Sequence, residues 1–253
     1  MVSGLDYAFA AGAGLLAGGV NAIAGGGTLI SFPALQAIGL TSIDANVTNI
    51  VALTPGYLAG SYAQRGDLSG QARTARLLGV AAGLGGLVGS VLLVTVTGST
   101  FSAVVPYLIL LACAALLAQG WLRTLLEARR ATQARPLGDG HLERAGVFCC
   151  GVYGGFFGAG LGIMLLAVLG LFTNDALNRV NVLKQVLSLV ISLLASAFLA
   201  FSGHVAWGLA GAVAVASVAG GFLGGRMVHL VNPVVLRVLV VLLGVAVAVH
   251  FWV

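Results

Sequence analysis

The chain has 253 residues, of which 59% are hydrophobic and only 8% are charged. A soluble domain carries roughly 25% charged residues, so this composition excludes a soluble enzyme and indicates a membrane protein made of apolar helices. The 38 glycines are typical of closely packed membrane helices. The net charge is +5, but the basic residues form no aromatic-interleaved patch, so we expect no nucleic-acid partner.

Ten apolar segments follow one another along the chain. Four of them come in two pairs, within residues 7–39 and 145–172, and each pair is too long for one straight span and contains a glycine cluster. We therefore expect each pair to form a hairpin broken at its glycines, which either crosses the membrane or re-enters it. Six segments have the length of a single span: residues 45–64, 74–97, 101–122, 176–201, 205–228 and 233–252.

The charged residues orient these segments. Residues 123–144 form the only long polar stretch and are rich in arginine, which predicts a surface loop on the cytoplasmic side. If each pair is a hairpin, every arginine falls at or near that side and both termini lie in the periplasm. The first six residues include no basic residue, so we expect the first apolar stretch to be retained rather than cleaved.

The chain also repeats itself. Gly25-x-Gly27 matches Gly160-x-Gly162, and Gly85-Gly86-x-x-Gly89 matches Gly220-Gly221-x-x-Gly224, both at a sequence offset of 135. Asn46-x-x-Asn49 matches Asn178-x-x-Asn181 at an offset of 132, which pairs Lys184 with Ala52. Each half makes an odd number of crossings beyond its hairpin, so the halves insert in opposite orientations, as in many secondary transporters.

The predicted fold is therefore an all-α polytopic membrane protein with two inverted-topology repeats. Each repeat consists of a Gly-broken helical hairpin and three transmembrane helices. Residues 1–122 form the N-terminal membrane repeat, 123–144 the basic cytoplasmic connector, and 145–253 the C-terminal membrane repeat.

Two glycine-rich stretches carry a family resemblance. The sequence from Asn21 to Leu35, with Gly25-Gly26-Gly27 and Pro33, resembles the start of the TauE/SafE family of sulfite and organosulfonate permeases. Gly158-Ala-Gly160-Leu-Gly162 looks like its counterpart in the second half, and the resemblance covers nearly the whole chain. It implies a permease for small sulfur-containing anions, often an exporter.

Several residue types in this pattern suit a small anion. Broken helices expose backbone N–H groups at helix N-termini, which attract negative charge. Lys184, the only lysine, lies inside an apolar segment, where a charge costs at least about 2.5–3.5 kcal/mol and is by default functional. Amides at helical spacing can donate hydrogen bonds to an oxyanion or join helices. The candidate substrate-binding residues are Asn21, Gly25, Gly26, Gly27, Asn46, Thr48, Asn49, Gly158, Gly160, Gly162, Asn178, Arg179, Asn181, Lys184 and Gln185.

We therefore expect a secondary transporter of the bacterial inner membrane that moves sulfite or a short organosulfonate by alternating access, in the direction of export. The alternatives are an uptake permease or channel for another small anion, or the membrane subunit of a larger complex. An intramembrane enzyme is disfavoured because no catalytic motif is present, and no cofactor or metal site is expected. The expected partners are the anion and the lipid bilayer, and the fold allows a homodimer.

Overall fold

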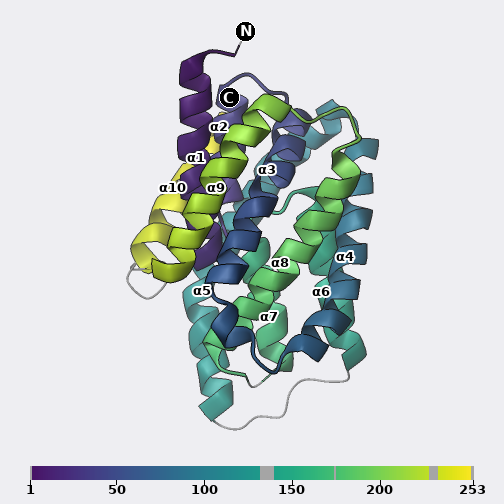
Figure 1. Ribbon diagram of the computed structural model, residues 1–253, viewed down its shortest axis with the longest axis vertical. Helices are drawn as coiled ribbons and strands as arrows, with labels where there is room; N and C mark the ends of the chain where they lie inside the picture. Colours follow the sequence, from purple (N-terminus) through teal and green to yellow (C-terminus); the bar gives the residue numbers. More distant parts are fainter. Residues whose placement is uncertain (1, 132–139, 174, 228–232, 252–253) are drawn as a thin grey trace.

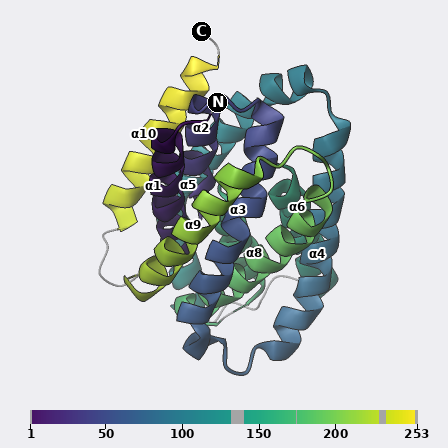
Figure 2. The ribbon, with the colours of Figure 1, turned by 45° about the horizontal axis from the view of Figure 1, so that its top comes forward.

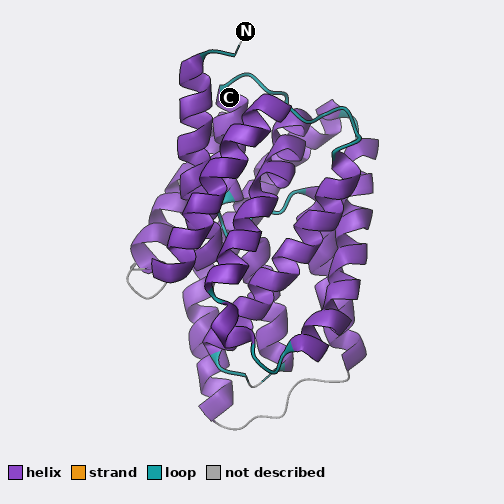
Figure 3. Cartoon of the chain, viewed as in Figure 1, coloured by secondary structure: helices purple, strands orange, loops and turns teal. Residues whose placement is uncertain are grey.

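The computed structural model describes residues 2–131, 140–173, 175–227 and 233–251, and in these residues it is built of helices without any strand (Figures 1 and 3). The chain belongs to the all-α, multi-pass membrane class. The first half contains α1 (Gly4–Ile23), α2 (Thr28–Ala37), α3 (Ser42–Ala63), the short 3-10 helix η1 (Arg65–Leu68), α4 (Ala72–Thr95) and α5 (Gly98–Ala131). The second half contains α6 (Gly140–Phe156), α7 (Leu161–Phe172), α8 (Leu177–Leu199), α9 (Trp207–Met227) and α10 (Pro233–His250).

Each apolar segment predicted from the sequence corresponds to one of these helices. Among the described residues, α4, α5, α8 and α9 are both long and apolar enough to cross a membrane, so four of the six predicted spans meet both criteria. Helix α3 is 22 residues long, but its buried polar side chains lower its hydropathy. Helix α10 falls among the shorter apolar helices in its described part, Val234–Val249.

The prediction of a surface loop over residues 123–144 is wrong over most of its length. Helix α5 continues to Ala131 and α6 already begins at Gly140, so within this stretch the undescribed residues are 132–139. The physical reason is helix propensity, because residues 122–131 consist mainly of Leu, Arg, Ala and Glu, which favour helix once an apolar segment has nucleated it.

Glycine faces join the two halves. Helix α9 packs against α1 and α3, and α4 packs against α6 and α8 (Figures 1 and 2). A Cβ atom built on Gly220 would overlap the Leu15 carbonyl oxygen, and one on Gly155 would overlap the Gly86 carbonyl oxygen. The predicted use of the small-residue stripes around Gly85 and Gly220 in close helix packing is therefore confirmed.

Both hairpins turn in the same way. Gly25 follows α1 with a φ of +85°, Gly158 follows α6 with a φ of +78°, and such positive values favour glycine. The Gly25 N–H donates to the Val20 carbonyl, and the Gly158 N–H donates to the Tyr153 carbonyl, five positions back in each case. The structural equivalent of Gly25 is therefore Gly158, rather than Gly160 as the sequence pattern suggested.

The three longer helices of the first half begin at positions equivalent to those of the second half. Helices α3, α4 and α5 begin at positions 42, 72 and 98, and α8, α9 and α10 begin at 177, 207 and 233, so all three pairs share a sequence offset of 135. In this register the counterpart of Lys184 is Asn49, which corrects the earlier pairing with Ala52. The offset of 132, inferred from the two asparagine pairs, is wrong for these helices. It aligns Asn46 with Asn178, whereas the offset of 135 aligns Asn46 with Asn181.

The bundle has two polar ends. At the upper end in Figure 1, the start of α3 meets the start of α5 and the α8–α9 loop, since Ser102 bonds Ser42 and His204 lies 2.7 Å from Asp44. At the lower end, η1 and the end of α3 meet the start of α8. Helix α1 enters from the upper end and α6 from the lower end (Figure 1).

Candidate functional site

The two glycine turns meet inside the bundle. A Cβ atom on Gly25 would lie 2.8 Å from the Cα atom of Gly162, so the backbones of the two turns are in contact. Helix α1 approaches this meeting point from the upper end of the bundle and α6 from the lower end (Figure 1). Gly26 packs against Leu116 and Gly160 against Ala112, so α5 supports both turns from one side.

Side chains within each hairpin hold its turn in place. Asn21, which is 4% exposed, accepts a hydrogen bond from the Gly27 N–H at 2.7 Å. Gly27 approaches the Ala17 carbonyl so closely that no Cβ atom would fit. In the other hairpin, the Tyr153 hydroxyl donates to the Ala159 carbonyl at 2.6 Å. Asn21 therefore orients the first turn.

Lys184 brings a positive charge to the place where the turns meet. Its side chain is 2% exposed, and its Cδ atom lies 3.4 Å from where a Cβ atom of Gly162 would be. The Lys184 ammonium donates to Asn181 Oδ1 at 2.8 Å. A buried cation in the apolar interior costs about 2.5–3.5 kcal/mol or more, so its retention here points to a negatively charged ligand or to a specific network.

Two buried amides, one on α3 and one next to Lys184 on α8, have unused hydrogen-bonding groups. Asn49 is fully buried and Gln185 is 1% exposed, and within the described part of the chain none of their side-chain N and O atoms has a hydrogen-bond partner. Gly60 leaves room for Gln185, because a Cβ atom there would lie 2.5 Å from Gln185 Nε2. Each unpaired buried polar group costs roughly 1–3 kcal/mol, so these amides require water or a ligand.

A polar stripe on α8 faces α3 below these amides. Asn181 Nδ2 donates to Gln64 Oε1 at 2.7 Å, and Asn178 Nδ2 donates to Asp67 Oδ1 at 2.9 Å. The spacing of three and four positions does place Asn178, Asn181 and Gln185 on one helix face, as the sequence predicted, since all three side chains meet α3 or η1. These bonds, called here the lower network, close the bundle between Lys184 and its lower end.

Aromatic side chains occupy the corresponding place above the turns. Phe32 and Phe101 both stack edge-on against Phe157, with ring centroids 5.4 and 6.4 Å apart, and Phe101 also meets Phe156. Phe156 and Phe157 directly precede the turn at Gly158. Phe32, Phe101 and Phe157 are at most 1% exposed. The four rings, called here the phenylalanine cluster, therefore form an apolar group next to the turn at Gly158.

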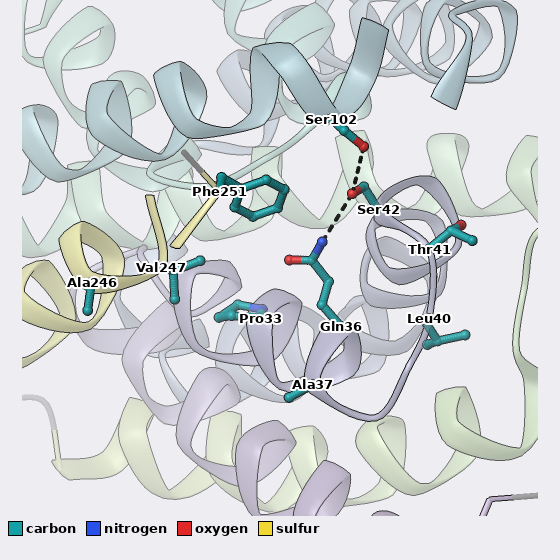
Figure 4. A pocket seen from close by; sticks show the side chains of 10 residues that line it. All are labelled: Pro33, Gln36, Ala37, Leu40, Thr41, Ser42, Ser102, Ala246, Val247 and Phe251. Atoms are coloured by element: carbon teal, nitrogen blue, oxygen red, sulfur yellow. Dashed lines mark hydrogen bonds between the residues drawn. The ribbon is translucent and has the colours of Figure 1, made fainter. Parts of the chain in front are cut away.

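A cavity of about 790 Å³ lies above the phenylalanine cluster, between α2, α3, α5 and α10 (Figure 4). Its polar side is a chain of hydrogen bonds, in which Gln36 Nε2 and the Ser102 hydroxyl both donate to Ser42 Oγ. Its apolar side includes Val247 and Phe251. Pro33 and Ser102 of its wall adjoin Phe32 and Phe101 of the phenylalanine cluster in sequence.

The structure places the remaining predicted residues away from the centre or in capping contacts. Asn46 Nδ2 donates to the Phe156 carbonyl at 2.8 Å, and Thr48 Oγ1 accepts from the Ala206 N–H at 3.0 Å, so these side chains satisfy helix ends. Asn178 is exposed, and Arg179 lies 3.6 Å from Asp175 in an ion pair near the lower end. Eight of the other predicted residues lie at the turns: Asn21, Gly25, Gly26, Gly27, Gly158, Gly160, Gly162 and Lys184. Asn181 and Gln185 face α3 from α8, and Asn49 is buried on α3.

The sequence reasoning missed Gln64, Ser188 and the phenylalanine cluster. Ser188 is 1% exposed, its hydroxyl has no hydrogen-bond partner in the described part, and it continues the stripe of Asn181 and Gln185 three positions further along. Extending that spacing along α8 would have found it. Gln64 and the phenylalanines offered no comparable signal, because only tertiary contacts set them apart from other polar and apolar residues.

The fold and this site define a multi-pass helical membrane protein in which two glycine turns meet beside a buried cation. The chain matches the family model described as sulfite exporter TauE/SafE over residues 10–251. It belongs to this family of membrane transporters, as the glycine-rich stretches indicated. No curated protein and no solved structure gives a significant match.

Proposed function

We propose that the protein is a secondary transporter that carries a small sulfur-containing anion, such as sulfite or a short organosulfonate, out of the cell. The observation that carries this proposal is the buried Lys184 ammonium where the two broken helices meet, together with the unpaired buried amides of Gln185, next to it on α8, and of Asn49 on α3. Amide donors gathered beside a buried cation suit an oxyanion, because they combine charge with hydrogen bonds to several oxygens.

Alternating access is supported by the pseudo-symmetric construction. Two inverted repeats would give the helix starts a common sequence offset, which they have. They would also pack the first helix of each half against a helix of the other half, as α1 packs against α9 and α6 against α4. We infer that rocking of one half against the other opens the two ends in turn. Such motion would break the lower network at one end and part the phenylalanine cluster at the other.

The two ends differ in a way that suits opposite sides of a membrane. Arg65, Arg73, Arg76 and Arg226 lie at the lower ends of their helices, and by the positive-inside rule they support a cytoplasmic position for that end. The cavity beside Ser42 then faces the periplasm. In this orientation the lower network is the cytoplasmic gate and the phenylalanine cluster is the periplasmic gate.

Flux of radiolabelled sulfite into proteoliposomes that contain only this chain tests the proposal. Wild-type protein should give saturable flux that internal unlabelled sulfite stimulates. Lys184→Gln should raise KM at least about tenfold, because the ion pair with the anion is lost. Arg226→Gln, which removes an exposed cation of the lower end, is the matched control and should keep wild-type flux.

Two results would contradict the proposal. Flux that does not saturate and ignores internal sulfite would indicate a channel. Absence of flux from folded wild-type protein, judged by a single symmetric size-exclusion peak, would favour a subunit of a larger complex.

A further inference from the structure

A contact between the two halves joins them at the upper end of the bundle. His204, in the α8–α9 loop of the second half, places its Nδ1 atom 2.7 Å from Asp44 Oδ1, in the first turn of α3 in the first half. The Thr41 hydroxyl donates to the other carboxylate oxygen, Asp44 Oδ2, at 2.7 Å, which leaves Oδ1 for the loop. Gly203, with a φ of +81°, turns the loop directly before His204. Each partner is therefore positioned by its own segment of the chain.

An equivalent contact lies at the lower end, but its chemistry differs. There Asn178, at the start of α8, donates to Asp67 of η1, in the connection that follows α3. Because α3 and α8 are equivalent helices, each end is joined by a bond from the start of one to the segment after the other. The amide of Asn178 carries no charge at any pH, whereas histidine changes its charge between about pH 5 and 8. Of these two contacts, the one made by His204 is therefore the one that responds to pH in this range.

We propose that Asp44 and His204 form a latch between the two halves that tightens as the pH falls on the upper side of the protein. Both side chains reach solvent, with exposed fractions of 30% for Asp44 and 42% for His204, so protons have direct access to the pair. A protonated imidazole is a cation, which attracts the carboxylate by its charge as well as through the hydrogen bond. The consequence for transport, slower opening of the upper end at low pH, rests on the proposed function, whereas the latch itself does not.

The described residues around the pair bring no competing charge to it. Apart from the pair, the cavity beside it is lined by residues without ionisable side chains from α3, α5 and the loop: Thr41, Ser42, Ile43, Gly98, Ser102 and Gly203. At the same end, the Asp6 carboxylate is held in the cap of its own helix, α1, and the Tyr7 hydroxyl lies against Gly208 of α9. The charge state of the latch is therefore set by its own two side chains.

Cysteine labelling tests the latch without any measurement of flux. Ile43 is 8% exposed and lines the cavity beside the pair, so Ile43→Cys reports opening of the upper end. Modification by N-ethylmaleimide is followed at about pH 5.5 and 8 in a chain whose native cysteines are replaced by alanine. At each pH the rate for added His204→Gln is divided by the rate for its parent, which cancels the pH dependence of the thiol itself. From the higher to the lower pH this ratio should rise about 1.4- to fivefold, the range that an exposed ion pair supports.

Two further variants complete the test. His141→Gln, at an exposed histidine on α6, is the matched control, and its ratio should be the same at both pH values. Asp44→Asn should raise the ratio at the lower pH as His204→Gln does, so either variant decides if the other does not fold. A ratio for His204→Gln that fails to rise by at least about 1.4-fold would overturn the latch. Because no flux is measured, this outcome is distinct from a failure of the proposed function, which the sulfite assay reveals by itself.

Discussion

Gly220 on α9 lies so close to α1 that there is no room for a Cβ atom at this position. A Cβ atom there would overlap the Leu15 carbonyl oxygen and would lie 3.0 Å from the Gly19 nitrogen, both backbone atoms of α1. Ordinary contact begins at 3.4 Å, so Gly220→Ala must push α1 and α9 apart. Because backbone cannot rotate away as a side chain can, we expect the variant to be less stable.

The expected size follows from the packing of the two helices. Overpacking a close interface costs typically about 1–3 kcal/mol, which corresponds to a decrease in Tm of roughly 2–12 °C for a chain of this size. The matched control is Gly211→Ala on the same helix, where no atom lies within 4 Å of the added Cβ. This control should keep or raise the Tm, since alanine favours helix by up to about 1 kcal/mol over glycine.

Thermal unfolding in detergent, followed by size-exclusion chromatography of heated samples, measures both variants. The reasoning is refuted if Gly220→Ala and Gly211→Ala have the same Tm. Such a result would mean that α1 and α9 are not held at the distance that the structure shows.

Three other substitutions test separate parts of the site. Gly25→Ala should abolish sulfite flux, because its Cβ atom would displace Gly162, whereas Gly39→Ala, which also has a positive φ but no neighbour within 4 Å, should keep it. Thr48→Val should lower stability by about 1 kcal/mol through loss of the α9 cap while keeping KM for sulfite, and a raised KM would place Thr48 in the binding site. Phe32→Ala should increase the sulfite leak through the phenylalanine cluster, measured as flux without internal sulfite, and Phe201→Ala, at a side chain 92% exposed, should leave the leak unchanged.

Much of this architecture could be predicted because its causes are local. Apolar runs specify where helices form, and the predicted segment over 161–172 coincides with α7. The glycine clusters specify where hairpins turn, because few other residues adopt the positive φ of Gly25 and Gly158. The buried state of Lys184 also followed from sequence, since the apolar residues around it leave no aqueous surface on that helix.

Tertiary structure decided which polar residues remain available to a ligand. Asn46, Thr48 and Asn49 share one short stretch of α3, yet the first two satisfy the ends of α6 and α9, and only Asn49 keeps all its amide groups unpaired. That outcome depends on helix ends in the other half of the chain, which approach α3 because glycine faces on α1, α4, α6 and α9 match. Hydropathy is a property of each segment alone, whereas pairing of buried polar groups depends on every helix that surrounds them.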